Sequence, residues 1–277
     1  MKASLALTLL PGAEAVGAVH RVTGPQPDNL CGPYWVAILL ASAGQGSPSP
    51  ERVAVAARTL LPASGDPSSW VPPGEPNREG ATGSIGRVDD PGVSGTSIRG
   101  MVEAVEALSE GSFRLLPLRG RGGQPLDAPA LEQLVETLEQ KAGWRASPVL
   151  NLRTGALWGT RLPIADAFAY VVGEDVQPSE PEWDVGHFVN LAGILRGPER
   201  TMAVLRDSYP SFGSGGDHLQ PLQVVAEALA RGDGREGGCL LFLPAEHALA
   251  AEVELKQAGF DTGTWDNGTP YEQGGKA

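Results

Sequence analysis

The sequence predicts an α+β fold in which helices come first and antiparallel strands follow. Helical spacing of apolar residues dominates up to residue 61 and returns at 97–109, whereas the strand patterns gather in the second half. Strands and helices show little regular alternation, which disfavours a parallel sheet built from strand–helix–strand units. We therefore expect an N-terminal helical part packed on an antiparallel sheet.

Taken in order, the N-terminal half is mainly helical. A short strand or turn ends near residue 10, and helices are expected over 12–21, 33–44 and 50–61, the last with Pro50 in its first turn. A helix over 97–109 places five apolar residues on one face, namely Ile98, Met101, Val102, Val105 and Leu108. A strand over 113–118 follows, and Asp127 then caps a helix that ends near residue 142.

The C-terminal half carries the clearest strand patterns. Strands are expected over 148–152, 167–172, 187–195, 202–206 and 239–243, and helices over 221–231 and 245–258. The turn at 197–199 makes the strands 187–195 and 202–206 an antiparallel pair. Residues 1–262 are predicted to form a single domain, interrupted by an irregular insert over about 62–96 that is rich in Pro, Gly, Ser and Asp and is either disordered or a lid. Residues 263–277 form a polar tail that we expect to be loosely held.

Composition excludes several classes of function. The net charge of −12 argues against nucleic-acid binding, which needs a concentrated surplus of Lys and Arg. No apolar run approaches the ~20 residues of a membrane helix, and Glu14 interrupts the weak likeness of the N-terminus to a signal peptide, so cytoplasmic residence and no membrane partner are expected. Neither metal-ligand spacing nor a phosphate-binding glycine loop is present, so no metal or cofactor is expected. The oligomeric state is left open.

The two cysteines lie in different contexts. Cys239 belongs to an apolar strand pattern and is predicted to be a small core residue. Cys31 precedes an apolar helical run, with Pro33 suited to its first turn. At that position the backbone donors and the positive end of the helix dipole favour the thiolate. Gly32 would leave room beside the sulfur for a substrate carbonyl, and Gly186 is a further expected substrate-binding residue.

A thiolate that attacks an acyl group needs a proton partner and an oxyanion stabiliser. Among the four histidines, His20 and His247 are expected at helix surfaces and His218 in a glycine-rich loop. His187 follows Gly186 at the start of a strand, and Asp207 ends the next strand. Counted outward from the turn at 197–199, the two match in register within a residue or two, so Asp207 could orient the His187 ring and leave its other nitrogen for Cys31.

Two side chains ahead of the cysteine are candidates for the oxyanion site. Gln26 could donate from its side-chain amide together with the Cys31 backbone N–H, and Asn29 is the reserve for that role. A purely structural reading stays open, in which His187 is a core histidine and Asp207 caps the turn before Pro210.

The pattern of Gln26, Cys31-Gly32, Gly186-His187 and Asp207 resembles papain-like cysteine peptidases. It is most similar to the bacteriocin-processing and phytochelatin-synthase-like branches, and it covers three patches rather than the whole chain. The resemblance implies a papain-like fold with Cys31 as nucleophile, His187 as base and acid, Asp207 as orienter and Gln26 as oxyanion donor. Residues 10–14 and 30–33 also resemble an uncharacterised actinobacterial family, which implies no function.

Three functions are compatible with this pattern. The first is hydrolysis of a peptide or amide bond through an acyl-thioester on Cys31. The second is acyl transfer by the same triad to an amine or thiol, with the 62–96 insert excluding water. The third is a non-catalytic peptide-binding module on the same scaffold, which a separation of more than about 5 Å between the Cys31 sulfur and the His187 nitrogens would favour.

Overall fold

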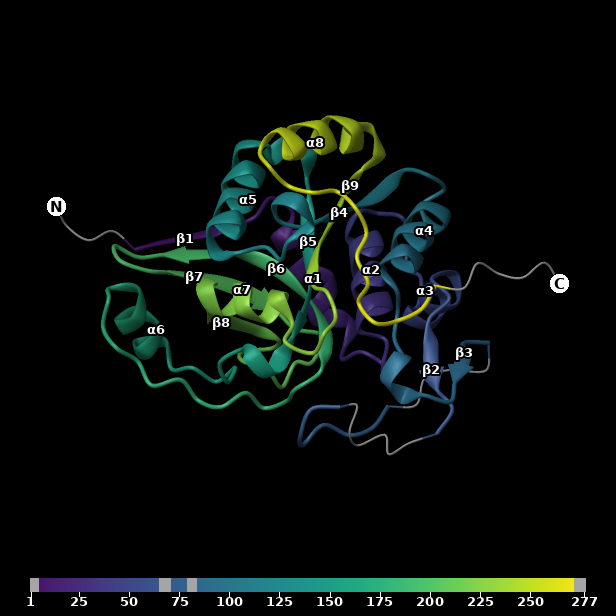
Figure 1. Ribbon diagram of the computed structural model, residues 1–277, viewed down its shortest axis with the longest axis horizontal. Helices are drawn as coiled ribbons and strands as arrows, with labels where there is room; N and C mark the ends of the chain where they lie inside the picture. Colours follow the sequence, from purple (N-terminus) through teal and green to yellow (C-terminus); the bar gives the residue numbers. More distant parts are fainter. Residues whose placement is uncertain (1–4, 65–70, 79–83, 272–277) are drawn as a thin grey trace.

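A seven-stranded antiparallel sheet forms the centre of the protein (Figure 1). The computed structural model describes residues 5–64, 71–78 and 84–271. The strand order is β4-β9-β5-β6-β7-β8, and β1 pairs with β6 beside this path. The strands are β1 (Ala6–Leu9), β4 (Phe113–Leu118), β5 (Ser147–Arg153), β6 (Gly186–Arg196), β7 (Thr201–Arg206), β8 (Asp217–Pro221) and β9 (Gly238–Pro244). With the helices, the sheet makes the chain an α+β protein, as the sequence predicts.

Helices cover both faces of the sheet, because its central strands are apolar on both sides. In β9, Cys239 and Leu241 belong to one buried core, whereas Leu240 and Phe242 belong to the other. The first core includes α5 (Ala128–Gln140), α7 (Leu222–Ala230) and α8 (Ala245–Gln257). The second includes α1 (Ala13–Thr23), α2 (Cys31–Ser42), α3 (Pro50–Ala56) and α4 (Ile98–Leu108). Figure 1 shows α7 in front of the sheet, α8 at the top of the molecule, and α1 and α2 behind the sheet.

The helix α2 is enclosed on all sides. Residues 32–40 are all buried, whereas Cys31 at its first position is partly exposed. Trp35, one turn further on, donates a hydrogen bond from Nε1 to the Phe188 backbone oxygen of β6 at 2.9 Å. This bond joins the first turn of α2 directly to the strand that carries His187.

Some sequence-based elements differ in the structure. The expected strand over 167–172 is wrong, because this segment belongs to the helix α6 (Ile164–Val171), whose Ala167 and Val171 pack on Leu195 and Met202. A short apolar run does not distinguish a strand from a buried helix face. The helix expected over 50–61 ends at Ala56 and is followed by β2 (Leu60–Pro62).

Part of the predicted insert is regular. The strand β3 (Gly86–Val88) pairs in parallel with β2, and Asp90 caps a short 3-10 turn at Pro91–Val93. The expected disorder or lid function of the rest of 62–96 falls largely on residues 65–70 and 79–83, which lie outside the described residues. Across the described chain, no helix is long and apolar enough to cross a membrane.

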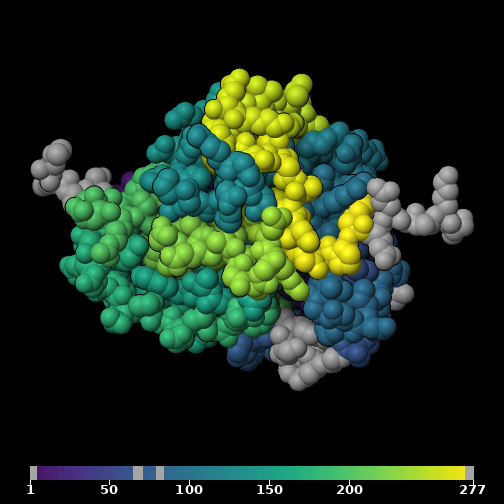
Figure 2. All heavy atoms as spheres, viewed as in Figure 1, coloured from purple at the N-terminus to yellow at the C-terminus, as the bar shows by residue number. Residues whose placement is uncertain are grey.

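The described part of the predicted polar tail is not loose. Trp265 is 6% exposed, packs against Gly238 of β9 and donates from Nε1 to the Asn151 side-chain oxygen at 3.2 Å. In Figure 2 this C-terminal segment, coloured yellow, runs along the surface between the teal and blue parts of the chain. The packed structure therefore extends beyond residue 262.

Replacing Trp265 with alanine is expected to lower the free energy of unfolding by about 3–5 kcal/mol, because it leaves a cavity against the sheet and removes the partner of Asn151. Urea unfolding followed by far-UV circular dichroism measures the change. Leu249→Ala on α8, where the leucine is 74% exposed, is the control and should change stability by less than about 0.5 kcal/mol. Equal effects of the two substitutions would show that the C-terminal segment is not packed.

Candidate active site

The described residues enclose a cavity of about 380 Å³ at one end of the sheet. Five sequence-predicted site residues line it, namely Gln26, Asn29, Cys31, Gly186 and His187. Asp207 lies behind His187 and is 2% exposed. The structure thus brings together residues that lie up to 181 positions apart in the sequence.

Cys31 is the first residue of α2, two positions earlier than the predicted helix start. Asn29 has φ 60°, a left-handed conformation that asparagine tolerates better than most residues, and it turns the chain into the helix. The Cys31 thiol is partly exposed and lines the same cavity as His187, whose pKa it helps to raise. A partly exposed sulfur at a helix N-terminus that shares a cavity with an imidazole is suited to nucleophilic chemistry.

The pair His187 and Asp207 is buried and joined by hydrogen bonds. His187 Nε2 lies 3.1 and 3.2 Å from the two carboxylate oxygens of Asp207. Asn190 of β6 pairs with Arg206 of β7. Asp207 lies one residue beyond Arg206, and His187 lies three residues before Asn190. The two site residues are therefore offset by two positions in the register. The Asp207 carboxylate also accepts a hydrogen bond from the Tyr209 backbone N–H at 2.9 Å. Since Nε2 faces Asp207, Nδ1 is the ring nitrogen left for the Cys31 sulfur.

The surroundings favour a charged pair. Burial by itself lowers the pKa of His187, but the charge of Asp207 and the hydrogen bonds with Asp207 and Cys31 outweigh it and raise that pKa to about 10. For Asp207 burial acts in the opposite direction, and the charge and hydrogen bond of His187 hold the carboxyl pKa below its ordinary value. At neutral pH the pair is therefore an imidazolium next to a carboxylate.

Gln26 is tied to the chain segment that follows Asp207. Its side-chain oxygen accepts a hydrogen bond from Ser208 Oγ at 2.6 Å, and its Nε2 donates to the Tyr209 hydroxyl at 3.2 Å. Its backbone N–H donates to the Ser208 oxygen at 3.2 Å. These bonds hold the Gln26 amide rigidly at the cavity wall.

The two glycines predicted at the site have different surroundings. Gly186 lines the cavity, and a side chain there would collide with the Arg231 guanidinium. Gly32 is buried away from the cavity, and an added Cβ would lie 2.9 Å from the Met101 sulfur and 3.4 Å from the Phe188 ring. The expectation that Gly32 opens the approach to the sulfur is therefore corrected: glycine is needed there because α2 packs closely on α4 and β6.

Two histidines expected at the surface or in a loop are buried near Asp207. His20 on α1 stacks on the Trp35 ring at 5.4 Å and donates from Nε2 to the Asp207 backbone oxygen at 2.8 Å. His218 lies in β8, and burial lowers its pKa, so it is neutral. The burial of His20 could have been predicted from its helical spacing from Val16, because both side chains share the inward face of α1.

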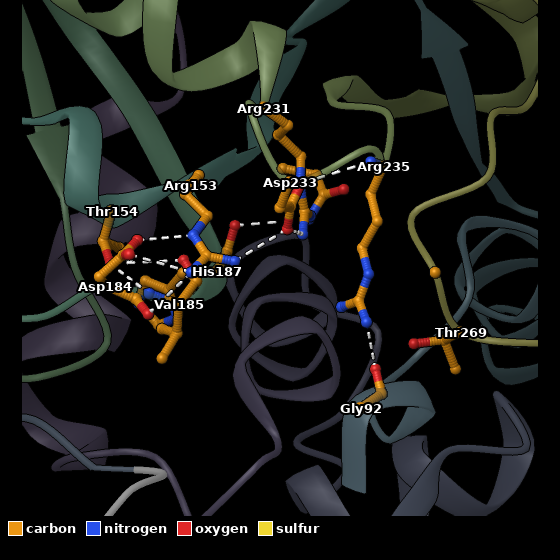
Figure 3. Close-up of polar contacts among 12 residues, drawn as sticks. Gly92, Arg153, Thr154, Asp184, Val185, His187, Arg231, Asp233, Arg235 and Thr269 are labelled. Atoms are coloured by element: carbon orange, nitrogen blue, oxygen red, sulfur yellow. Dashed lines mark hydrogen bonds and ion pairs between the residues drawn. The ribbon is translucent and has the colours of Figure 1, made fainter. Parts of the chain in front are cut away.

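A group of charged residues also lines the cavity and was not predicted. It comprises Arg153 at the end of β5, Asp184 before β6, and Arg231, Asp233 and Arg235 in the loop between α7 and β9. Figure 3 shows their contacts beside His187. They were not predicted because they belong to three separate segments of the chain, which meet only through the sheet topology.

The remaining candidates for site chemistry are inert or absent. Cys239 is fully buried in β9, and burial raises the pKa of its thiol far above the ordinary range. Within the described ranges, no group of three or more His, Cys, Asp or Glu side chains is arranged to hold a metal ion.

The fold and the site define an α+β protein with a cysteine and a histidine at the wall of a cavity and an aspartate behind the histidine. The chain belongs to the family of unknown function DUF6885, whose model matches residues 10–266. A search of curated proteins gives no match.

Proposed function

We propose that the protein is a cysteine-dependent hydrolase of peptide or amide bonds, with Cys31, His187 and Asp207 as a triad on a papain-like fold. The observation that carries the proposal is that Cys31 and His187 line the same cavity, while His187 Nε2 lies 3.1 Å from the Asp207 carboxylate behind it. The fold assignment is supported by the helix that begins with Cys31 and packs on an antiparallel sheet carrying the other two residues.

In the first half of the reaction, the Cys31 thiolate attacks the carbonyl carbon, and the C=O π electrons move to oxygen. In this proposal the Cys31 backbone N–H and the Gln26 side-chain amide stabilise the oxyanion. When the tetrahedral intermediate collapses, the C–N bond breaks and the imidazolium of His187 gives its proton to the leaving amine. The acyl group remains on sulfur as a thioester.

In the second half, neutral His187 takes a proton from water, and the resulting hydroxide attacks the thioester carbonyl. The C–S bond then breaks, the carboxylic acid leaves, and Cys31 and His187 return to the thiolate and imidazolium. Asp207 holds the ring through Nε2 and stabilises its positive charge in both halves. Trp183, whose ring meets that of His187 edge-on at 5.2 Å, shields this pair from solvent.

The competing functions differ in what they require. A binding module without catalysis would be favoured by a sulfur far from the imidazole, whereas Cys31 acts on His187 strongly enough to help raise its pKa. Acyl transfer uses the same residues and differs only in the acceptor, so product analysis with added amines distinguishes it from hydrolysis.

A library of N-acetyl peptide anilides tests the proposal. We expect at least some members to be hydrolysed with release of the aniline. Iodoacetamide should inactivate the protein to the same extent as it labels Cys31. Cys239 is the internal control, because its complete burial should leave it unlabelled in the folded protein. Absence of turnover across the library, or turnover that survives complete Cys31 labelling, would contradict the proposal.

A further inference from the structure

The charge of the cavity differs in sign from that of the whole chain. The protein has a net charge of −12, but the charged side chains among the described cavity residues are three arginines and two aspartates. Leaving aside the Cys31 and His187 pair, the described wall carries one excess positive charge. Positive charge concentrated in a concave site of an acidic protein is suited to an anionic ligand group.

Two of the three arginines are neutralised. Arg153 pairs with Asp184 through Nε at 2.5 Å and with Asp233 through Nη1 at 2.9 Å. Arg231 pairs with the same Asp233 oxygen at 2.8 Å. Hydrogen bonds from Arg231 and Arg153 keep the pKa of Asp233 far below its ordinary value, so this carboxylate stays charged. Together these four residues contribute no net charge.

Arg235 is the remaining cation of this wall. Within the described part of the chain its guanidinium forms no ion pair, and its Nη2 donates to the Gly92 backbone oxygen. Its backbone N–H donates to Asp233 at 3.4 Å, and its side chain packs against Gly268. Figure 3 shows the side chain extending away from Asp233 toward Gly92, with Thr269 alongside. The guanidinium is thus held in place but keeps donors for a ligand.

A second polar side chain on the same wall has an acceptor oxygen without a hydrogen-bond partner among the described residues. Asn267, next to Gly268, is 7% exposed and lines the cavity. Its Nδ2 donates to the Thr96 oxygen at 3.0 Å, whereas its Oδ1 is buried with no hydrogen-bond partner among the described residues. A buried unsatisfied acceptor is costly, and a ligand N–H would satisfy it.

We propose that in this cavity Arg235 binds a carboxylate and Asn267 Oδ1 accepts from a neighbouring N–H, so that the preferred substrate is a peptide or amide bearing a carboxylate near an N–H group. The inference rests on the proposed function in that it names the substrate class for Cys31. A single excess positive charge matches one carboxylate, whereas it would leave a doubly charged phosphate only half neutralised. The carboxylate belongs to an acidic side chain or to a peptide C-terminus, which are two sources of the same chemistry.

Binding to the Cys31→Ala protein tests the subsite without turnover. Isothermal calorimetry compares N-acetyl tetrapeptides with Glu or Gln at one position, each with a free or an amidated C-terminus. We expect a peptide with a carboxylate to bind about tenfold or more tightly than its amide counterpart. Comparing the Glu with the Gln peptides, and the free with the amidated C-termini, shows which carboxylate is recognised. Inorganic phosphate should compete only weakly with the preferred peptide.

The added substitution Arg235→Gln is expected to bring the carboxylate-to-amide ratio of affinities close to one. The matched control is Arg21→Gln, which removes one positive charge from the exposed surface of α1 and should keep the preference. Equal affinity for acid and amide peptides, no binding of either, or a preference that survives Arg235→Gln would each overturn the subsite. Carboxylate-selective binding without any turnover by the wild-type protein would instead end the proposed hydrolysis and leave the subsite standing.

Discussion

Replacing Cys31 with alanine is expected to lower kcat for peptide anilides by about 10⁴-fold or more, because no other described group can form the acyl intermediate. The fold should be unaffected, since Cys31 is partly exposed and the packing of α2 depends on residues 32–40. The rate of aniline release at saturating substrate concentration measures kcat, and far-UV circular dichroism checks the fold.

Cys239→Ala is the matched control for this substitution. It removes the other thiol from β9, far from solvent, and should keep kcat while costing some stability. If the Cys31→Ala protein retained more than about a tenth of wild-type turnover, the sulfur would not be the nucleophile.

Replacing Asp207 with asparagine is expected to lower kcat by about 10²- to 10⁴-fold and to move the alkaline limb of the pH profile to lower pH. The proton that His187 gives to the leaving amine is held on the ring because the Asp207 charge helps raise the His187 pKa to about 10 against the effect of burial. Without that charge His187 loses its proton at lower pH, so activity declines earlier as pH rises. Profiles of kcat/KM between pH 5 and 11 measure the shift.

The same pair makes a pH-dependent contribution to stability. The His187 pKa is raised above its ordinary 6.5, so its contribution is full below that pH and is lost as pH rises toward about 10. The Asp207 pKa lies below 3.8, so its contribution is present above that value and is lost as pH falls through the lowered pKa. The difference in Tm between wild type and Asp207→Asn should therefore be larger at pH 6 than at pH 10. An unshifted alkaline limb together with a pH-independent Tm difference would show that Asp207 does not set the charge of His187.

Local sequence signals were sufficient for elements that their own residues determine. Pro33 and the apolar run after it indicated α2, and the turn at 197–199 set the pairing of β6 with β7 that places His187 near Asp207. The helical layer of α5, α7 and α8 on the opposite face was not predicted, because no local pattern states which face of a sheet a helix covers.

Features that depend on long-range packing could not be predicted from local patterns. The polar composition around Trp265 indicated a loose tail, but its indole meets the glycine of β9. The burial of His20 depends on Trp35 and Asp207, which are distant in sequence. Among the described residues, the guanidinium of Arg235 is left without an ion pair because Asp233, two residues before it, already pairs with Arg153 and Arg231. This arrangement is visible only in the folded structure.

Intact-mass spectrometry after rapid acid quench detects the proposed acyl-thioester on Cys31. The protein is mixed with the nitrophenyl ester of the best peptide in the library, for which acylation is fast and hydrolysis of the thioester limits turnover. We predict a mass increase equal to the acyl group, located by digestion to the peptide containing Cys31 and missing from Cys31→Ala. Ester turnover without this adduct, or an adduct on another residue, would contradict the account.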